Sequence, residues 1–263
     1  MDSTTTSHLV PAQTLKGKTA IVSGSSSGIG LAIARELSSR GCNIVLNYPF
    51  PSLSAQALNL TSEFTTKAIA VCANISTVEG PQALINAAVS EFGKIDILVN
   101  NAALAVNLPF EEQTLEHWDS LVNLNGRGTF LLTQAALPHL VEKGARIVNI
   151  DSISSRAAPP LQTIYAGTKG MVDSFTRCWA KELPPKYSCT VNAVSPGPTM
   201  TEGFAAAGEA FMKEMKPVMD QTPVGSRMAN PDEIAFAVAF LCEPRASWIN
   251  GLNLTASGGL FID

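Results

Sequence analysis

Tyr165 and Lys169 lie four residues apart, and Ser152 precedes the tyrosine by thirteen residues. A spacing of four places two side chains on one face of a helix, one turn apart. A free phenol titrates near pH 10, and bringing its pKa to about 7 takes roughly 4 kcal/mol of preferential stabilisation of the phenolate. An ammonium group about 4 Å away supplies roughly that amount at an effective dielectric constant near 20. The pair therefore suits a tyrosine that acts as acid and base, with the Ser152 hydroxyl bonded to the oxygen that gains or loses the proton.

A tyrosine and a lysine with this spacing also occur by chance on many helices, so the pair needs support from elsewhere in the chain. A glycine-rich loop supplies it, because Ser23-Gly24-Ser-Ser-Ser-Gly28-Ile-Gly30 directly follows an apolar run at 19–23. Gly24 permits a tight turn, Gly28 lets the backbone approach a pyrophosphate, and Gly30 allows close helix–strand packing. The helix that begins there offers amide donors to phosphate. A loop of this composition can also exist without a ligand, but its place in the first βα unit predicts a dinucleotide site.

The elements that must position these residues alternate along the chain. Short apolar runs without polar alternation predict strands covered on both faces, at 19–23, 43–47, 68–72, 95–99, 146–150, 190–194 and 252–255. Helical stretches separate them, at 28–40, 53–64, 81–92 and 115–142, around Tyr165 as far as Pro184, and at 232–242. Seven strands joined by right-handed crossovers make an α/β fold, a single-domain Rossmann-type doubly wound parallel sheet.

The domain boundaries follow from the same pattern. We expect a flexible N-terminal tail over 1–14 and one dinucleotide-binding catalytic domain over 15–263. The segment 201–221 interrupts the alternation and is rich in Met, Ala and Phe, which predicts a mobile lid over a substrate pocket.

Composition excludes several classes of protein. Hydrophobic residues make up 46% of the chain and charged residues 15%, with a net charge of -4, so the chain is neither disordered nor a nucleic-acid binder. We expect no secretory signal and no membrane span. The cysteines have no metal-ligand spacing, which favours reduced thiols in a cytoplasmic protein without a metal site: Cys42, Cys72, Cys178, Cys189 and Cys242.

The spacing Gly-x-x-x-Gly-x-Gly together with Tyr165-x-x-x-Lys169 resembles the short-chain dehydrogenase/reductase family. The resemblance runs over nearly the whole chain from about Lys16. Further stretches match family motifs in the right order: residues 100–103 after the fourth strand, residues 118–125, and Pro196-Gly197 with Thr201.

This resemblance implies roles for four residues of a catalytic tetrad. Tyr165 would be the acid and base, and Lys169 would lower its pKa and bind the ribose. Ser152 would polarise the substrate carbonyl. Asn125 would hold a water molecule that links Lys169 to solvent, although without the resemblance the sequence favours an asparagine that breaks a helix among glycines.

The resemblance and the glycine loop together also imply a nicotinamide cofactor. The residues expected to contact it are Gly24, Ser25, Ser27, Gly28, Ile29, Gly30, Asn47, Tyr48, Ser52, Asn74, Asn101, Ala102, Ala103, Tyr165, Lys169, Pro196, Gly197, Thr199 and Thr201. Thr201 could serve instead, or in addition, as the N-cap of a lid helix.

The second strand favours NADPH over NADH as the cofactor. Sheets of this type that select NAD carry an acid after that strand to bond the ribose 2′-hydroxyl. Here the strand runs into Asn47-Tyr48-Pro-Phe-Pro-Ser52 with no acid, which resembles family members that use NADP. No basic residue precedes the second glycine, so we expect neutral donors such as Ser25, Asn47 and Ser52 to hold the 2′-phosphate.

Three positions depart from the family pattern. Ala103 replaces a glycine and could crowd the cofactor loop. Asn74 stands where many members have an aspartate that contacts the adenine, a contact that an amide can still make. Asp151 precedes Ser152 where a small residue or serine is more common; its carboxylate could bind a cationic or hydroxylated substrate, but we expect it to point to solvent.

The substrate is less defined by the sequence. Residues 123–128, 165–169 and 248–251 resemble fungal ketoreductases of polyketide and naphthol pathways, which implies a small-molecule ketone or alcohol of secondary metabolism. The lid offers apolar, adaptable side chains that suit a hydrophobic or aromatic ketone or equally pack the lid itself: Met200, Phe204, Phe211, Met212 and Met215.

Other activities share these motifs. A dehydrogenase of fatty-acyl or steroid-like substrates would carry the same residues, as would a biosynthetic cyclase or dehydratase on the same fold. A protein that only senses NADP is disfavoured, because such relatives usually lose the tyrosine or the lysine. The family also implies a homotetramer or homodimer, and an apolar stripe on the Tyr165 helix suits either a subunit contact or the core: Met171, Phe175, Cys178 and Trp179.

Overall fold

The computed structural model describes residues 13–206 and 208–263, so most of the expected N-terminal tail lies outside the described residues. The described chain contains a seven-stranded sheet in the order β3-β2-β1-β4-β5-β6-β7, with every neighbouring pair parallel. The strands are β1 (Thr19–Val22), β2 (Asn43–Tyr48), β3 (Ala68–Cys72), β4 (Ile97–Asn100), β5 (Ala145–Ile150), β6 (Cys189–Pro196) and β7 (Asn253–Ala256). The predicted doubly wound parallel sheet is confirmed.

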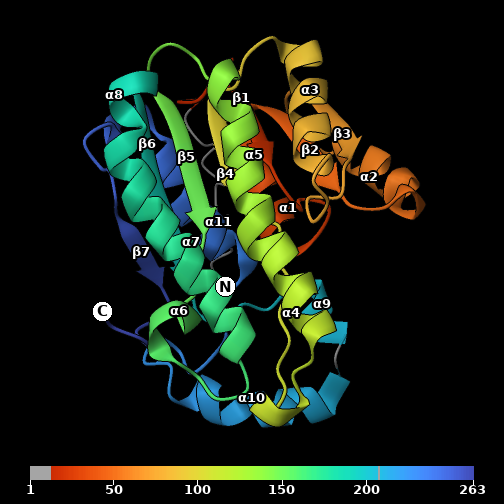
Figure 1. The fold of residues 1–263 in the computed structure, drawn as a ribbon, viewed down its shortest axis with the longest axis vertical. Helices are drawn as coiled ribbons and strands as arrows, with labels where there is room; N and C mark the ends of the chain where they lie inside the picture. The colour runs from red at the N-terminus through yellow and green to blue at the C-terminus, as the bar shows by residue number, and fades with distance from the viewer. Residues whose placement is uncertain (1–12, 207) are drawn as a thin grey trace, which may run out of the picture.

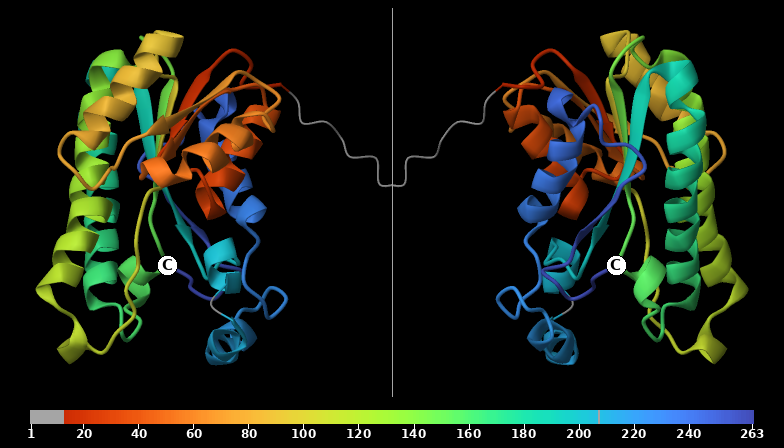
Figure 2. Two further views of the ribbon diagram at one scale, coloured as in Figure 1. Left: turned by 90° about the vertical axis from the view of Figure 1, so that its right-hand side faces the viewer. Right: turned by 90° about the vertical axis from the view of Figure 1, so that its left-hand side faces the viewer.

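Helices cover both faces of the sheet, as the end-on views of Figure 2 show. One layer holds α1 (Gly28–Ser39), α2 (Ser54–Thr61) and α11 (Pro231–Cys242), and the other holds α3 (Gly80–Phe92), α5 (Thr129–Ala136) and α7 (Thr163–Glu182). Two hydrophobic clusters fill the spaces between the sheet and these layers. Strands β1, β4, β5 and β6 are buried along their whole length, which explains why they contain almost no polar alternation.

The remaining elements include one helix of 13 residues and several shorter ones. They are α4 (Leu115–Leu121), α6 (Ser154–Ala157), α8 (Pro184–Tyr187), α9 (Glu202–Ala206), α10 (Gly208–Asp220) and 3₁₀ turns at Pro51–Leu53, Phe110–Glu112, Leu137–His139 and Pro244–Ala246. In the part of the chain that the structure describes, no helix is both long and apolar enough to cross a bilayer.

The long helix expected over 115–142 is interrupted. A π-helical turn, Val122–Gly128, separates α4 from α5, and the helical path ends at a 3₁₀ turn that contains Pro138. A Cβ at Gly126 would lie 2.8 Å from the Met171 sulfur, and a Cβ at Gly128 would lie 2.6 Å from the Ile75 carbonyl oxygen. Glycine at these positions therefore lets the π-helical turn approach α7 and the loop after β3.

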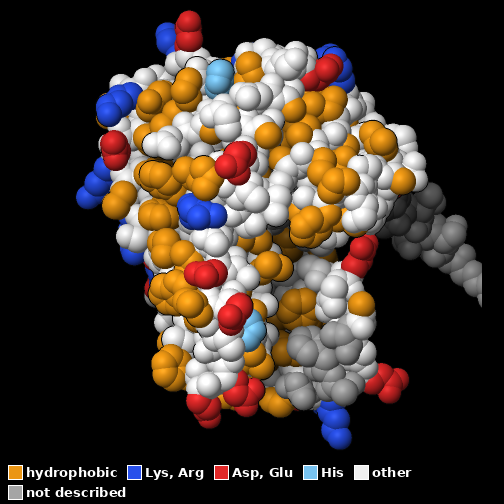
Figure 3. All heavy atoms as spheres, turned by 45° about the vertical axis from the view of Figure 1, so that its right-hand side comes forward, with side chains coloured by type: hydrophobic (Ala, Val, Ile, Leu, Met, Phe, Trp, Pro, Cys, Tyr) orange, Lys and Arg blue, Asp and Glu red, His pale blue; other side chains and the backbone are white. Residues whose placement is uncertain are grey.

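The 201–221 segment forms α9 and α10 at the carboxyl end of the sheet, at the bottom of Figure 1. Directly before this segment, Thr199 forms an isolated parallel β-bridge with Ala229. Met200 N–H donates to the Ala229 carbonyl at 2.8 Å. Figure 3 shows a hollow lined by hydrophobic side chains between this lower part of the molecule and the body above it.

Candidate active site

The predicted site residues converge at the carboxyl ends of the central strands. The glycine loop follows β1, Asn101 follows β4, Ser152 follows β5, and Pro196 ends β6. Because all strands are parallel, their carboxyl ends meet at one edge of the sheet. The strand order reverses between β1 and β4, which is the place where doubly wound sheets bind ligands.

Ser152, Tyr165 and Lys169 come together beside the end of β5. The Ser152 hydroxyl accepts a hydrogen bond from Ser154 N–H at 3.1 Å and interacts with the Tyr165 phenol, whose pKa it lowers. Lys169 is only 3% exposed and donates from Nζ to the Ile150 carbonyl at 2.8 Å. Its Nζ lies 5.8 Å from the centre of the Tyr165 ring, so the spacing of four in α7 does place both side chains on one face.

The electrostatics of the pair differ from the sequence-based expectation. Burial raises the pKa of the Tyr165 phenol, the bond to Ser152 lowers it, and the Asp151 carboxylate raises it. Burial also lowers the pKa of Lys169 to about 8, against the opposing effect of Asp151. The phenol pKa is therefore raised overall, because burial and the nearby carboxylate outweigh the interaction with Ser152, and the lowering by Lys169 that the resemblance implies stays a prediction.

Asn125 lies in the π-helical turn and is 1% exposed. Its carboxamide accepts from Leu104 N–H at 2.9 Å and donates to the Leu104 carbonyl at 2.9 Å and to Thr168 Oγ1 at 3.0 Å. These bonds tie the chain after β4 to α7, next to Lys169. One lone pair of the Asn125 oxygen is left for a further partner such as a water molecule.

The glycine loop has a backbone that fits a dinucleotide. Gly24 and Gly28 have φ of 61° and 55°, which glycine adopts without strain. The first helical bond of α1 runs from Leu31 N–H to the Ser27 carbonyl, so the amides of Gly28, Ile29 and Gly30 belong to the open helix N-terminus. Three such amides at the start of a twelve-residue helix suit a pyrophosphate.

Two of the expected phosphate donors are engaged elsewhere. Asn47 is 1% exposed; it accepts from Gly24 N–H at 2.9 Å and donates to the Ala73 carbonyl at 2.9 Å. The buried Ser25 hydroxyl donates to the Val22 carbonyl at 2.7 Å and accepts from Asn47 N–H at 2.9 Å. The expectation that Ser25 and Asn47 hold a 2′-phosphate is therefore wrong, since their polar groups fasten the loop to β2.

The other residues near β2 are more open. Ser27 and Ser52 are exposed, and Ser27 makes no side-chain cap to α1. The Tyr48 hydroxyl shares a hydrogen bond of 3.0 Å with Ser54. The hydroxyl groups of Ser27 and Ser52 therefore replace the side chains of Ser25 and Asn47 as the candidate donors to a 2′-phosphate.

Residues on the expected adenosine side also stabilise loops. Asn101 donates from Nδ2 to the carbonyls of Ser23 and Gly24 at 2.9 and 3.0 Å, and Ala102 N–H donates to Ser23 Oγ at 3.0 Å. Ala103 is exposed and so does not crowd the described loop. The Asn74 oxygen accepts from Ser76, which leaves its amide donors as the part that could meet an adenine.

The expected nicotinamide side joins the sheet to the 201–221 segment. Gly197 packs so closely that a Cβ would lie 3.0 Å from Ser257 Cα, and the Thr199 hydroxyl donates to the Gly197 carbonyl at 3.0 Å. Thr201 Oγ1 accepts from Phe204 N–H at 3.3 Å at the start of α9. A Cβ at Gly28 would lie 3.3 Å from the Thr201 methyl group, so this threonine also contacts the glycine loop.

Asp151 does not point to solvent, contrary to the sequence-based expectation. It is 2% exposed, and its Oδ2 accepts from Ser155 Oγ, Ser195 Oγ and Asn253 Nδ2 at 2.9, 3.1 and 2.8 Å. These partners come from α6, β6 and β7, which close over the end of β5. Polar residues inside the otherwise apolar strands, such as Ser195 and Asn253, were the available signal for this buried network.

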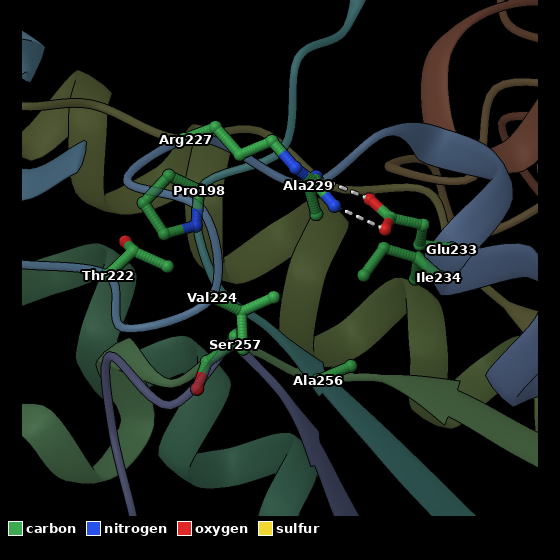
Figure 4. A pocket seen from close by; sticks show the side chains of 10 residues that line it. Pro198, Thr222, Val224, Arg227, Ala229, Glu233, Ile234, Ala256 and Ser257 are labelled. Carbon is green, nitrogen blue, oxygen red and sulfur yellow. Dashed lines mark hydrogen bonds and ion pairs between the residues drawn. The ribbon is translucent and has the colours of Figure 1, made fainter.

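The cavity shown in Figure 4 lies beside this site and does not include Ser152, Tyr165 or Lys169. It has a volume of about 170 Å³, and Pro198, Ala229, Ile234 and Ser257 are among its lining residues. The two charged residues at it, Arg227 and Glu233, are bonded to each other at 2.6 Å. We place the chemistry at Tyr165, because Glu233, the one carboxylate among the described residues that line the cavity, is paired with Arg227, which lowers its pKa.

Comparisons with known proteins agree with this geometry. Residues 24–261 match the family described as enoyl-(acyl carrier protein) reductase. The chain is 39% identical to short-chain dehydrogenase/reductase FrzI of a Cladobotryum species over 254 residues, which cover 95% of this chain and 98% of the relative. It is 36% identical to the hydroxynaphthalene reductase-like protein Arp2 of Metarhizium anisopliae over 259 residues, covering 94% and 96% of the two chains.

A solved structure shares the whole fold. It is a short-chain dehydrogenase from Burkholderia cenocepacia in complex with NADP, which superposes with a TM-score of 0.86 at 31% identity. The alignment covers 94% of this chain and 98% of that one.

Proposed function

Because the chain belongs to the short-chain dehydrogenase/reductase family of oxidoreductases, we propose that it transfers a hydride between NADPH and the carbonyl carbon of a hydrophobic or aromatic ketone. The reverse reaction oxidises the corresponding alcohol. The observation that carries this proposal is that Tyr165 shares one face of α7 with the buried Lys169, whose Nζ lies 5.8 Å from the Tyr165 ring centre and 2.8 Å from the Ile150 carbonyl oxygen, next to Ser152.

The chain supplies the proton of the reaction, and the dinucleotide when bound supplies or accepts the hydride. Burial raises the pKa of the Tyr165 phenol, so the phenol is protonated at neutral pH and can give its proton to the oxygen of the reduced ketone. The Ser152 hydroxyl, held by Ser154 N–H, can donate to the same oxygen. The buried Lys169 ammonium favours the phenolate that remains.

The residues that would hold the dinucleotide are the open amides at the start of α1, with Thr201 opposite them. NADPH is favoured because no acid follows β2 and because the Burkholderia cenocepacia relative was solved with NADP. Ser27 and Ser52 would hold the 2′-phosphate in place of the engaged Ser25 and Asn47.

A kinetic comparison of the two reductants tests this preference. We expect a lower KM and a higher kcat/KM with NADPH than with NADH, because nothing at the end of β2 repels a phosphate. Replacing Ser52 with Ala should narrow the difference in kcat/KM between NADPH and NADH. The control is Ser62→Ala, which removes the hydroxyl of another exposed serine, at the end of α2. A higher kcat/KM with NADH would reject the preference.

The Tyr165→Phe variant tests the reaction itself. It removes the proton donor but keeps the ring, so we expect turnover of a ketone panel to fall by roughly 10²- to 10⁴-fold while NADPH affinity is retained. Tyr187→Phe makes the same chemical change in α8 and should leave turnover intact. Full activity of Tyr165→Phe would reject the assignment.

The substrate class is proposed from the relatives and from the 201–221 segment. Arp2 is named as a hydroxynaphthalene reductase-like protein, and the chain around the 201–221 segment offers partly buried apolar side chains at Met200, Phe204, Met212 and Met215; the Phe211 side chain lies outside the described residues. A fatty-acyl substrate is the second candidate, because the matching family is described as an enoyl-(acyl carrier protein) reductase. NADPH consumption with aromatic ketones and with acyl thioesters separates the two.

Assembly with further copies is also proposed. Trp118 and Phe130 on α4 and α5 are 52% and 41% exposed, and Phe130, Phe175 and Trp179 form a chain of aromatic contacts along this face. Trp248 is 97% exposed beside the last strand. Two apolar faces of this kind support a homodimer or homotetramer.

A further inference from the structure

Asp151 is a buried carboxylate that the catalytic scheme above does not use. Its Oδ2 accepts three hydrogen bonds, from Ser155, Ser195 and Asn253, while its Oδ1 is buried without a hydrogen-bond partner. The Asn253 amide donates to Oδ2 at 2.8 Å, whereas Ser155 and Ser195 each share one hydroxyl proton between Oδ2 and a nearer acceptor, the Ser152 carbonyl and Asn253 Oδ1, both at 2.7 Å. A buried acceptor without a partner is costly, so the structure keeps this group for a reason other than its own stability.

The backbone connects Asp151 directly to the proton-transfer residues. Asp151 lies between Ile150, whose carbonyl accepts from Lys169 Nζ at 2.8 Å, and Ser152, which interacts with the Tyr165 phenol. The carboxylate acts electrostatically on both Tyr165 and Lys169. Among the described residues, Asp151 takes part in no ion pair within 4.0 Å, so the interaction with Lys169 is one between nearby charges and not a direct contact.

A second buried aspartate shows what is unusual about Asp151. Asp173 accepts from the same Asn253 side chain at 2.9 Å, but it also forms ion pairs with Arg156 and Arg177 at 3.0 and 2.8 Å. Two guanidinium groups thus neutralise Asp173, and the hydrogen bond from Asn253 together with these guanidinium groups holds its pKa below the ordinary value against the effect of burial. Asp151 has no guanidinium partner, and Lys169 is the cation that it faces.

We propose that Asp151 is a positioning residue for proton transfer, whose buried negative charge keeps Lys169 and the Tyr165 phenol protonated and so sets the pH at which the site passes from ketone reduction to alcohol oxidation. This inference rests on the proposed function of the site. It assigns a task to a residue at which this chain departs from the family pattern.

The groups packed around Asp151 define the sign of the effect. Lys169 and Tyr165 of α7 interact with it electrostatically, and the Ser155 hydroxyl of α6, the Ser195 hydroxyl of β6 and the Asn253 amide of β7 lie within hydrogen-bond distance of its Oδ2. Asn253 also contacts Asp173, which forms ion pairs with Arg156 and Arg177. Arg156 forms a further ion pair with Asp263.

A negative charge raises the pKa of a neighbouring phenol and of a neighbouring ammonium group. Burial raises the pKa of Asp151 itself, while Lys169 and the three hydrogen bonds oppose that rise. Removal of the charge must therefore lower the pH midpoint of both Tyr165 and Lys169.

Direct titration of the phenol tests the inference without requiring turnover. The chain has 3 tyrosines, so the ultraviolet absorbance of tyrosinate in each protein, minus that of the same protein carrying Tyr165→Phe, isolates the Tyr165 curve. We expect Asp151→Asn to move this midpoint down by roughly one pH unit. Asp173→Asn is the matched control, since it replaces a buried aspartate that is hydrogen-bonded to the same Asn253 side chain. It should leave the midpoint of Tyr165 unchanged.

Coincident curves for the protein and for Asp151→Asn would overturn the inference, as would an equal shift in Asp173→Asn. Asp151→Ser is a second variant without the charge, in case the asparagine does not fold, and circular dichroism establishes folding of each variant over the titration range. The pH profile of kcat/KM then adds the catalytic readout: its midpoint for ketone reduction should fall in parallel with the phenol. A titration shift in a protein that reduces no ketone would support the role of Asp151 and reject the proposed function, so the two failures are distinguishable.

Discussion

The glycine loop after β1 and the 201–221 segment face each other across the site, and they are built in opposite ways. In the loop and its supports, Ser23, Ser25, Asn47 and Asn101 use their polar groups to hold backbone atoms of neighbouring strands. The 201–221 segment is joined to the body at its entry by the bridge between Thr199 and Ala229, and α10 carries an exposed Lys216–Asp220 pair and Pro217 inside the helix.

This difference suits the two ligands that the site is proposed to take. A loop whose buried polar groups are satisfied by one another cannot deform without leaving some of them unpaired, at a cost of about 1–3 kcal/mol for each group. Exposed ion pairs such as Lys216–Asp220 contribute little to stability, so α10 can shift at low cost. The loop therefore offers one preformed surface to an invariant dinucleotide, whereas the segment can adapt to the substrate.

The largest effect that tests this comparison is expected for Gly30→Ala in the loop. A Cβ at Gly30 would lie 2.4 Å from Asn101 Nδ2 and 2.4 Å from the Gly24 carbonyl oxygen, so the hydrogen bonds that hold the loop must break. We expect the free energy of unfolding to fall by about 1–3 kcal/mol and the affinity for NADPH to fall with it. Chemical denaturation and nucleotide fluorescence titration measure the two effects.

Gly203→Ala is the matched change in the opposite region. Gly203 lies in α9, and the atom nearest to an added Cβ is Thr201 Oγ1 at 3.9 Å, so alanine fits and should stabilise the helix by about 0.5–1 kcal/mol. Equal losses of stability in Gly30→Ala and Gly203→Ala would show that the two regions are equally rigid, which would break the comparison.

The two regions also differ in how far the sequence predicts them. Glycine spacing and apolar runs predict the loop, the strands and the helix that carries Tyr165 and Lys169, because these patterns are local. The engagement of Asn47 and Ser25 was missed, since the partners of these residues belong to other strands and to the loop itself. Their side-chain types suit a phosphate and a backbone carbonyl equally well, so composition alone could not separate the two roles.

Asp151 illustrates a second limit. Residues that follow a parallel strand often lie at an exposed edge, which made solvent the expected surroundings of this carboxylate. Its burial depends on Asn253, which is 102 residues away in sequence and reaches Asp151 only because β7 extends the sheet past β6. Similarly, the expected continuous helix over 115–142 contains a π-helical turn because Gly126 and Gly128 allow close contacts with Met171 and Ile75.

The smallest expected effect is the coupling between two substitutions at the contact between the two regions, where Gly28 meets Thr201. Gly28→Ala places a side chain at φ 55°, which costs about 1–2 kcal/mol for a residue other than glycine, and its Cβ would lie 3.3 Å from the Thr201 methyl group. Thr201→Ser removes that methyl group and keeps the hydroxyl that caps α9, so alone it should change the free energy of unfolding by less than about 0.5 kcal/mol.

A double-mutant cycle of these two substitutions measures the contact itself. Because the strain at φ 55° belongs to the loop, Thr201→Ser should recover only the steric part of the Gly28→Ala loss, roughly 0.5 kcal/mol. An additive cycle would mean that the segment moves away from the loop at no cost. Full recovery would mean that the contact, and not the backbone of the loop, dominates the penalty. Partial recovery of the stability lost in Gly28→Ala is the result expected if the loop is rigid and the 201–221 segment can shift.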